Sequence, residues 1–206
     1  MFFAYYKNMF RKMSLSGWVL ALFVAGVALK MYFESDAFNL KCIVSDVDGN
    51  KYCVRERAKL QLAADLLANT TQKLRKLVAY LGKTFPARAN CKRLVDNFDP
   101  QTVKEILPTS EYTAYSENKG EKLAFCTTTT KKGDKLIDPN TLMYVAIHEL
   151  AHIATKSIGH TQEFWQNFKF LLQNAVKIKI YNPVNYKKKN KNYCGMKITD
   201  NPLFDI

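Results

Sequence analysis

The sequence predicts an α+β fold, in which an N-terminal transmembrane helix precedes a small domain with a short antiparallel sheet and a buried helix. Residues 13–33 form an almost uncharged apolar run, and β-rich and helix-like patterns alternate beyond it. All three histidines fall within residues 148–160. We therefore expect a basic N-terminal tail at 1–12, a signal-anchor helix over the apolar run and one folded domain at 34–206.

Composition sets the scale of that domain. The chain has 206 residues, of which 48% are hydrophobic and 13% aromatic, so one compact domain plus an appendage can bury a substantial core. The 31 lysines and arginines exceed the 18 acidic residues and give a formal net charge of +13. This charge favours an anionic partner such as a membrane surface or a nucleic acid.

The apolar run is long enough to cross a membrane. It carries one charge, Lys30, and about 20 helical residues span a hydrocarbon core roughly 30 Å thick. Because Lys7, Arg11 and Lys12 precede it, we expect a single-pass protein with a cytosolic N-terminus. A cleavable signal peptide is the alternative, since small residues at 26–28 offer a cleavage site.

Ordered elements follow without repeats. The expected elements are a hairpin at 42–54, a long helix at 55–81, a short helix at 98–108 and two strands at 112–116 and 121–127. The hairpin turns at an Asp-Gly pair, and the two later strands are joined by the sequence ENKG. The long helix is predicted from leucines at three-to-four-residue spacing.

The cysteines allow disulfides but no CxxC motif. The five are Cys42, Cys53, Cys91, Cys126 and Cys194. Cys42 and Cys53 flank the hairpin turn and are the obvious disulfide candidate, while free buried thiols are the alternative. The odd number leaves at least one cysteine without an intramolecular partner.

The histidines lie on a helix with clear boundary signals. Asp138 is a good N-cap and Pro139 fits the first helical position, so we expect a helix over 139–156. Its residues are apolar nearly all round, which is typical of a buried helix. Gly159 is expected to end the helix, and Thr161 to cap the next one.

The sequence HELAH on this helix predicts a zinc site. His148 and His152 are four residues apart, so their rings project from one face and can bind one Zn²⁺, with Glu149 beside them. Three protein ligands and one open position are typical of catalytic zinc, for which Glu149 would be the general base.

The third ligand has two candidates. His160 follows the helix break and is favoured by ligand type, whereas Glu163 is the alternative, although it also suits the first turn of the next helix. The longer motif HExxHxxGxxH is absent.

The segment HELAHIATKSIGHTQEFW resembles the active-site segment of WLM and SprT-like zinc peptidases, which are small gluzincin-type domains. Residues 46–202, with VRERAKLQLAADLLA and YCGMKITDNPL, more closely resemble predicted membrane-anchored metallopeptidases of large DNA viruses. The resemblance implies a zincin-like domain that binds zinc through His148, His152 and His160 and uses Glu149 as general base. For a viral protein, the membrane would be that of the host or the virion.

The resemblance also implies where a substrate would lie. The strand at 121–127 would be an edge strand that pairs with an extended peptide. The implied substrate-binding residues are Lys122, Ala124, Cys126 and Tyr193. Tyr193 would donate to the oxyanion, with Tyr181 and Tyr186 as alternatives, and Met196 would pack beneath the site.

The C-terminal third is strongly basic. No acidic residue lies between Glu163 and Asp200, whereas eight lysines do: Lys169, Lys177, Lys179, Lys187, Lys188, Lys189, Lys191 and Lys197. A solvated loop, or attraction to anionic lipid beside the anchor, is the expected role of this segment, and contact with nucleic acid is the alternative.

These observations together predict a membrane-anchored zinc metalloendopeptidase that acts on proteins or peptides. Two alternatives stay open. One is a non-catalytic membrane or virion interaction protein that zinc stabilises, and the other is a DNA-associated protease.

Overall fold

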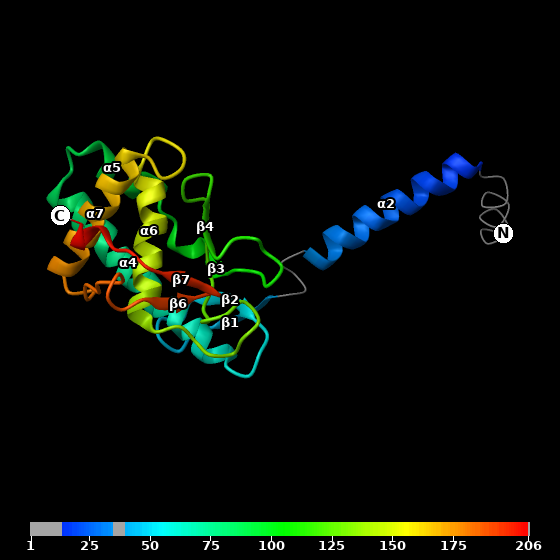
Figure 1. Ribbon diagram of the computed structural model, residues 1–206, viewed down its shortest axis with the longest axis horizontal. Coiled ribbons are helices and arrows are strands. Elements are labelled where there is room, and N and C mark those ends of the chain that lie inside the picture. Colours follow the sequence, from blue (N-terminus) through cyan, green and yellow to red (C-terminus); the bar gives the residue numbers. More distant parts are fainter. Residues whose placement is uncertain (1–13, 35–39, 206) are drawn as a thin grey trace. The chain divides into compact units, whose positions relative to one another are not determined.

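The computed structural model describes residues 14–34 and 40–205, and it divides the chain into two units at residue 39 (Figure 1). Each unit is described by itself. In chain order the elements are α2 (Leu15–Glu34), β1 (Leu40–Val44), β2 (Lys51–Arg55), α4 (Leu60–Thr84), α5 (Ala89–Asn97), the 3₁₀ turn η1 (Pro100–Thr102), β3 (Val103–Glu105), β4 (Ala114–Glu117), β5 (Lys122–Phe125), α6 (Pro139–Ala154), α7 (Gln162–Lys177), β6 (Lys191–Tyr193), β7 (Met196–Ile198) and the 3₁₀ turn η2 (Pro202–Phe204).

Helix α2 forms the described part of the first unit. Residues Leu15–Tyr32 are long and apolar enough to cross a membrane, and large side chains such as Leu20 and Phe23 are exposed along them. The basic tail expected at 1–12, with Lys7, Arg11 and Lys12, lies outside the described residues.

The second unit opens with the predicted hairpin. Strands β1 and β2 are antiparallel, and Cys42 lies opposite Cys53, to which a disulfide joins it. Helix α4 begins at Leu60, so the start predicted at Arg55 is wrong. Arg55 belongs to β2 because its guanidinium Nε donates to the buried Glu105 carboxylate at 2.8 Å, which ties the strand to β3.

The region before the sheet departs from the prediction. Residues 98–108 form a single 3₁₀ turn followed by strand β3, not a helix, and α5 occupies Ala89–Asn97, a stretch between the two predicted helices. The Asp99 side chain caps only this one turn. Val103 and Glu105 then point into the core of the sheet, so burial in the sheet overrides the local helical signal.

The sheet has the order β3–β5–β4 and is mixed. Strand β4 pairs antiparallel with β5, as predicted, but β3 pairs parallel with β5. Strand β5 is therefore central, and the prediction that residues 121–127 form an edge strand is wrong. Its residues Leu123, Ala124 and Phe125 are fully buried.

Helix α6 lies at the centre of the domain (Figure 1) and packs against α4, α5, α7 and β4. Asp138 caps it as predicted, because its carboxylate accepts hydrogen bonds from the N–H groups of Asn140 and Thr141 at 3.1 and 3.2 Å. Its residues facing the core, from Leu142 to Ala154, are almost all buried. The buried α6 and the α+β class are thus confirmed.

The lysine-rich segment ends in a hairpin that the sequence did not predict. Strands β6 and β7 are joined by Cys194 and Gly195, whose φ angles of 51° and 87° match a two-residue type I′ turn. Cys194 forms a disulfide with Cys126, at the end of β5, whereas Cys91 is free and buried.

We expect removal of this second disulfide to destabilise the domain strongly. The Cys126–Cys194 bridge spans 68 residues, so the double serine variant should lose roughly 4 kcal/mol of unfolding free energy. The matched control is the double serine variant at Cys42 and Cys53, whose bridge spans 11 residues and should cost about 2–3 kcal/mol. Urea unfolding of both variants tests this ranking, and a larger loss in the control would contradict it.

Candidate metal centre

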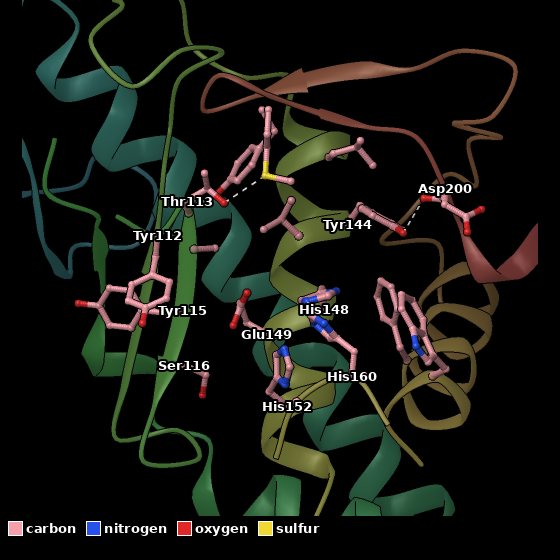
Figure 2. Close-up of a pocket in the computed structure, with 18 of the residues that line it drawn as sticks. Tyr112, Thr113, Tyr115, Ser116, Tyr144, His148, Glu149, His152, His160 and Asp200 are labelled. Atoms are coloured by element: carbon pink, nitrogen blue, oxygen red, sulfur yellow. Dashed lines mark hydrogen bonds between the residues drawn. The ribbon is translucent and has the colours of Figure 1, made fainter. Parts of the chain in front are cut away.

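The structure brings the three histidines to one point, although His148 and His152 lie on α6 and His160 lies in the loop between α6 and α7. The candidate ligand nitrogens of His148, His152 and His160 all lie within 4.8 Å of one another. The Nε2 atoms of His148 and His160 are 3.0 Å apart, and the ring centroids of His148 and His152 are 5.0 Å apart. Figure 2 shows the three rings converging beside α6.

This donor set fits a zinc ion. Three nitrogens at 2.0–2.1 Å from a tetrahedral zinc are separated by about 3.3 Å, which small ring rotations would reach from the observed positions. Burial, with the neighbouring histidines as a second cause, lowers the pKa of His148 to about 3 and that of His152 to about 4. Both rings are therefore neutral at pH 7, as metal ligation requires.

Glu149 lies between the histidines and strand β4 (Figure 2). Its side chain is only 5% exposed, and burial raises its pKa to about 8, against the opposing effect of a hydrogen bond from the backbone of Ser116. A bound cation beside this carboxylate would lower its pKa again. Glu149 is thus a carboxyl group that can hold a proton near neutral pH.

The loop that delivers His160 differs in detail from the prediction. Helix α6 ends at Ala154, not at Lys156, and Gly159 does not end it. Gly159 instead has a φ of +80° within the loop, immediately before His160, where its lack of a side chain eases the turn. Thr161 then caps α7 as predicted, since its hydroxyl accepts from the N–H of Phe164.

Glu163 is directed away from the histidines. Its carboxylate accepts hydrogen bonds from the backbone N–H groups of Lys156 and Ser157 at 3.2 and 3.3 Å and from Arg93 at 3.2 Å. These bonds, led by that from Lys156, lower the pKa of Glu163. Glu163 therefore fastens the loop that carries His160, and only the histidines form the ligand cluster among the described residues.

Lys119, in the turn after β4, fixes the same loop. This residue of the ENKG turn has a φ of 60°, and its ammonium group donates to the carbonyl oxygens of His152, Thr155 and Ser157 at 3.2, 2.8 and 2.8 Å. It thereby caps the C-terminus of α6, where a cation is electrostatically favoured. Sequence reasoning missed this residue because the contact is non-local.

The rings of Phe164 and Phe168 pack against the three histidines. The Phe164 ring lies 4.4 Å from that of His152 and 4.6 Å from that of His160, and Phe168 lies 5.1 Å from His148, measured between centroids. Both phenylalanines are fully buried. Nothing in the sequence showed that they pack beneath the histidines.

A cleft of about 880 Å³ contains the cluster. It is bounded by β4 and the turn after it, by α6 and α7, and by the C-terminal segment that begins at Tyr193. Glu149 and all three histidines line it, so the candidate centre is open to a large ligand.

The predicted substrate-binding residues are mostly not accessible. Lys122 lies exposed on β5 and pairs with Glu117 at 3.1 Å, while Ala124 and Cys126 are fully buried. None of the three lines the cleft. They cannot offer an edge to a peptide because β5 lies between β3 and β4. Tyr193 reaches the cleft, but its hydroxyl already donates to the carbonyl of Thr113 and accepts from the N–H of Cys126.

The other residues suggested for the site also have structural roles. Tyr181 and Tyr186 are buried and lie outside the cleft lining. Met196 is 48% exposed at the cleft wall, and its sulfur accepts from the Thr113 hydroxyl, so it does not pack beneath the histidines.

Comparison with known proteins places the chain among viral relatives. It is 30% identical to uncharacterized protein R325 of Acanthamoeba polyphaga mimivirus over 192 residues, which cover 89% of this chain and 95% of that protein. The chain belongs to the R325 family. Uncharacterized proteins 136R of Invertebrate iridescent virus 6 and 042R of Invertebrate iridescent virus 3 are each 37% identical to this R325-family chain, over 82 and 83 residues, or 44% and 50% of their lengths. The expected relatives in large DNA viruses are thus confirmed.

No protein-family model matches the sequence. Among solved structures, Wss1 from Saccharomyces cerevisiae aligns with a TM-score of 0.44 and 16% identity, over 60% of this R325-family chain and 84% of Wss1. At this level the likeness decides neither fold nor activity.

Proposed function

We propose that this R325-family protein is a membrane-anchored zinc metallopeptidase of zincin-like, WLM-related type. The observation that supports it best is the convergence of three histidines beside a buried glutamate in an open cleft. His148, His152 and His160 would hold the ion. A bound zinc ion supplies a Lewis acid that lowers the pKa of water to about 7 and polarises a carbonyl group.

Glu149 performs the proton transfers of the proposed reaction. Its carboxylate takes one proton from the water whose oxygen attacks the peptide carbonyl carbon, and it then delivers that proton to the amine nitrogen as the C–N bond breaks. The second proton of the water stays on the attacking oxygen, so the products are a carboxylic acid, which ionises at neutral pH, and an amine. The N–H of Ser116 and the burial beside β4 hold Glu149 in position for both transfers.

Strand β4 replaces β5 as the proposed substrate platform. The N–H of Cys126 donates to the carbonyl of Thr113, so by alternation the backbone groups of Ala114 and Ser116 point away from β5. Of these groups, the N–H of Ser116 is bonded to Glu149, so the N–H and carbonyl of Ala114 and the carbonyl of Ser116 are the ones offered to a peptide. Because β4 is an edge of the described sheet and lines the cleft, an extended peptide can pair with it there.

Helix α2 is the proposed anchor. It meets the length and composition required for one membrane span. The two disulfides of the second unit suit an oxidising compartment, so we place the peptidase domain on the side opposite a cytosolic N-terminus. The partners proposed are the membrane, through α2, and a protein or peptide substrate.

The alternative of a DNA-associated protease depends on the lysine-rich segment. Lys187 is paired with Asp200 at 3.3 Å and with Asp205 at 2.7 Å, which reduces the positive charge that the segment can present.

The full chain, reconstituted in lipid nanodiscs, tests the proposal. We expect about one zinc per chain, and cleavage of casein or a peptide library that stops on chelation and returns when zinc is restored. Full zinc occupancy without cleavage of any substrate would contradict the peptidase proposal and favour the non-catalytic virion or membrane protein.

A further inference from the structure

Exposed apolar side chains gather around the cleft. Of the large apolar residues that are exposed in the second unit, four line this cleft: Tyr112, Ile158, Trp165 and Met196, with exposed fractions of 65, 89, 42 and 48%. Exposed apolar groups that cluster around a concave site, as these do, indicate a binding surface for an apolar partner.

The apolar part adjoins the metal ligands directly. The Trp165 ring lies 5.7 Å from that of His160, the Phe168 ring 5.1 Å from that of His148, and Tyr144 lies 5.2 Å from Phe168. We call Tyr144, Trp165 and Phe168 the aromatic wall. Figure 2 shows Tyr144 on the side of His148 that faces Asp200, and the Tyr144 hydroxyl donates to the Asp200 carbonyl at 2.8 Å.

The opposite side of the histidines has a different character. There the cleft is lined by Tyr112, Tyr115 and Ser116, and Glu149 lies on this side (Figure 2). The turn after β4 adds Asn118 and Lys119 to the lining. A peptide that crosses the centre therefore meets tyrosines mixed with polar groups on one side of the reacting bond, and the aromatic wall on the other.

We infer that the aromatic wall is a specificity pocket for one large apolar side chain, aromatic or long aliphatic, immediately beside the bond that is cut. This inference rests on the proposed peptidase function and adds its substrate class, namely extended protein segments that carry such residues. Trp165 is the specificity-determining residue, since it is the exposed member of the wall and contacts a metal ligand. Aromatic rings bury large apolar areas on binding, and a difference of a single methylene can already alter selectivity about tenfold.

A matched peptide series tests the pocket. The zinc-loaded full chain in nanodiscs is given peptides that differ at one position, as Phe, Leu, Ala or Asp, and mass spectrometry locates the cleaved bond. We expect kcat/KM for Phe and Leu to exceed that for Ala by about tenfold or more, with the variable residue always adjacent to the cleaved bond. Equal cleavage of all four peptides would overturn the inference while leaving the peptidase proposal intact.

Variants at Trp165 add a second test. Trp165→Ala should lower kcat/KM for the Phe peptide about tenfold and that for the Ala peptide less than about twofold, and Trp165→Phe should restore most of the preference. The control is Phe204→Ala, because Phe204 is 39% exposed, close to the 42% of Trp165, but lies outside the cleft. Zinc content and unfolding midpoints of each variant separate recognition from damage to the metal centre. An equal fall in kcat/KM for the Phe peptide and the Ala peptide would contradict a specificity role.

Binding to Glu149→Gln separates this inference from the proposed function. Binding of the Phe and Asp peptides to the zinc-loaded variant is measured by calorimetry. One outcome is that the wild type cleaves nothing, but the variant binds the Phe peptide at least about tenfold more tightly than the Asp peptide. The pocket is then supported and the hydrolysis is not. If neither cleavage nor preferential binding is observed, both proposals fail.

Discussion

Replacing Glu149 by glutamine is expected to abolish cleavage and, at the same time, to make the metal-free protein more stable at pH 8. Loss of a general acid–base group lowers the rate by about 10²–10⁴-fold. The stability gain has a separate origin, because burial raises the pKa of Glu149 from 4.5 to about 8. At pH 8 a carboxylate is therefore held where an uncharged group would be preferred.

The direction of this stability change follows from the number of protons that the folded and unfolded chains bind. Between pH 4.5 and 8 the folded, metal-free protein keeps a proton on Glu149 that the unfolded chain has released, so its stability falls as the pH rises. Glutamine carries no such proton, and the variant should be more stable by on the order of 3 kcal/mol at pH 8 and by little at pH 5. His148 and His152 have lowered pKa values, which cost stability below pH 6.5 in both proteins and cancel in the difference.

Urea unfolding of the chelated full chain at pH 5 and pH 8 measures this difference, alongside the cleavage assay. Glu56→Gln is the matched control, because Glu56 is exposed and its side chain forms an ion pair with the likewise exposed Lys41. That control should change neither the cleavage rate nor the difference in unfolding free energy between pH 5 and pH 8. Zinc should reduce the stability difference, since a cation beside Glu149 favours its charged form. A variant that cleaves at the wild-type rate would exclude Glu149 as the general base.

Such a change, which removes activity and adds stability, is typical of functional sites. Nothing else on α6 explains the burial of a carboxyl group there, since no lysine or arginine pairs with Glu149 among the described residues. The buried Glu105 makes the contrast clear, because Arg55 and Arg57 both bind it at 2.8 and 2.7 Å. Glu105 is thus neutralised by two arginines of the protein, whereas Glu149 has no such cation beside it among the described residues.

Local signals predicted the centre of the site well. Asp138, Pro139 and the helical spacing of His148 and His152 act over a few residues, where backbone geometry leaves little freedom, and the structure keeps the helix they predict. Thr161 likewise marks the start of α7. Caps and helical periodicity thus fix the placement of side chains that lie within two turns of each other.

The features that could not be predicted from the sequence depend on contacts between residues far apart in the chain. The order of the strands depends on β3 pairing in parallel with β5, and this moves the free edge from β5 to β4. The C-terminal hairpin reaches the cleft through the Cys126–Cys194 bridge, and Lys119 reaches α6 across 33 residues or more. These contacts join segments whose separate patterns contain no sign of the partner, so only the folded chain reveals them.

The two candidates for the third ligand should behave very differently when they are replaced. His160→Ala removes a ring whose Nε2 lies 3.0 Å from that of His148, so zinc affinity should fall by more than about 100-fold, the upper range for loss of an outer-shell partner. Glu163→Gln removes only charge from a group that fastens the loop, because Gln can still accept hydrogen bonds from Lys156 and Ser157. Its zinc affinity should fall by about tenfold or less.

Competition with a chromophoric chelator measures both affinities in the full chain, and thermal unfolding without metal separates binding from folding. The metal-free His160→Ala variant should unfold close to the wild type, since His160 is exposed and belongs to no buried core. The reverse order of affinities, with Glu163→Gln losing more zinc than His160→Ala, would mean that the loop rearranges around the ion to bring Glu163 into the site. Rearrangement of that kind must break the Glu163 bonds to Lys156, Ser157 and Arg93 together, and this is the physical reason for expecting His160 to complete the centre.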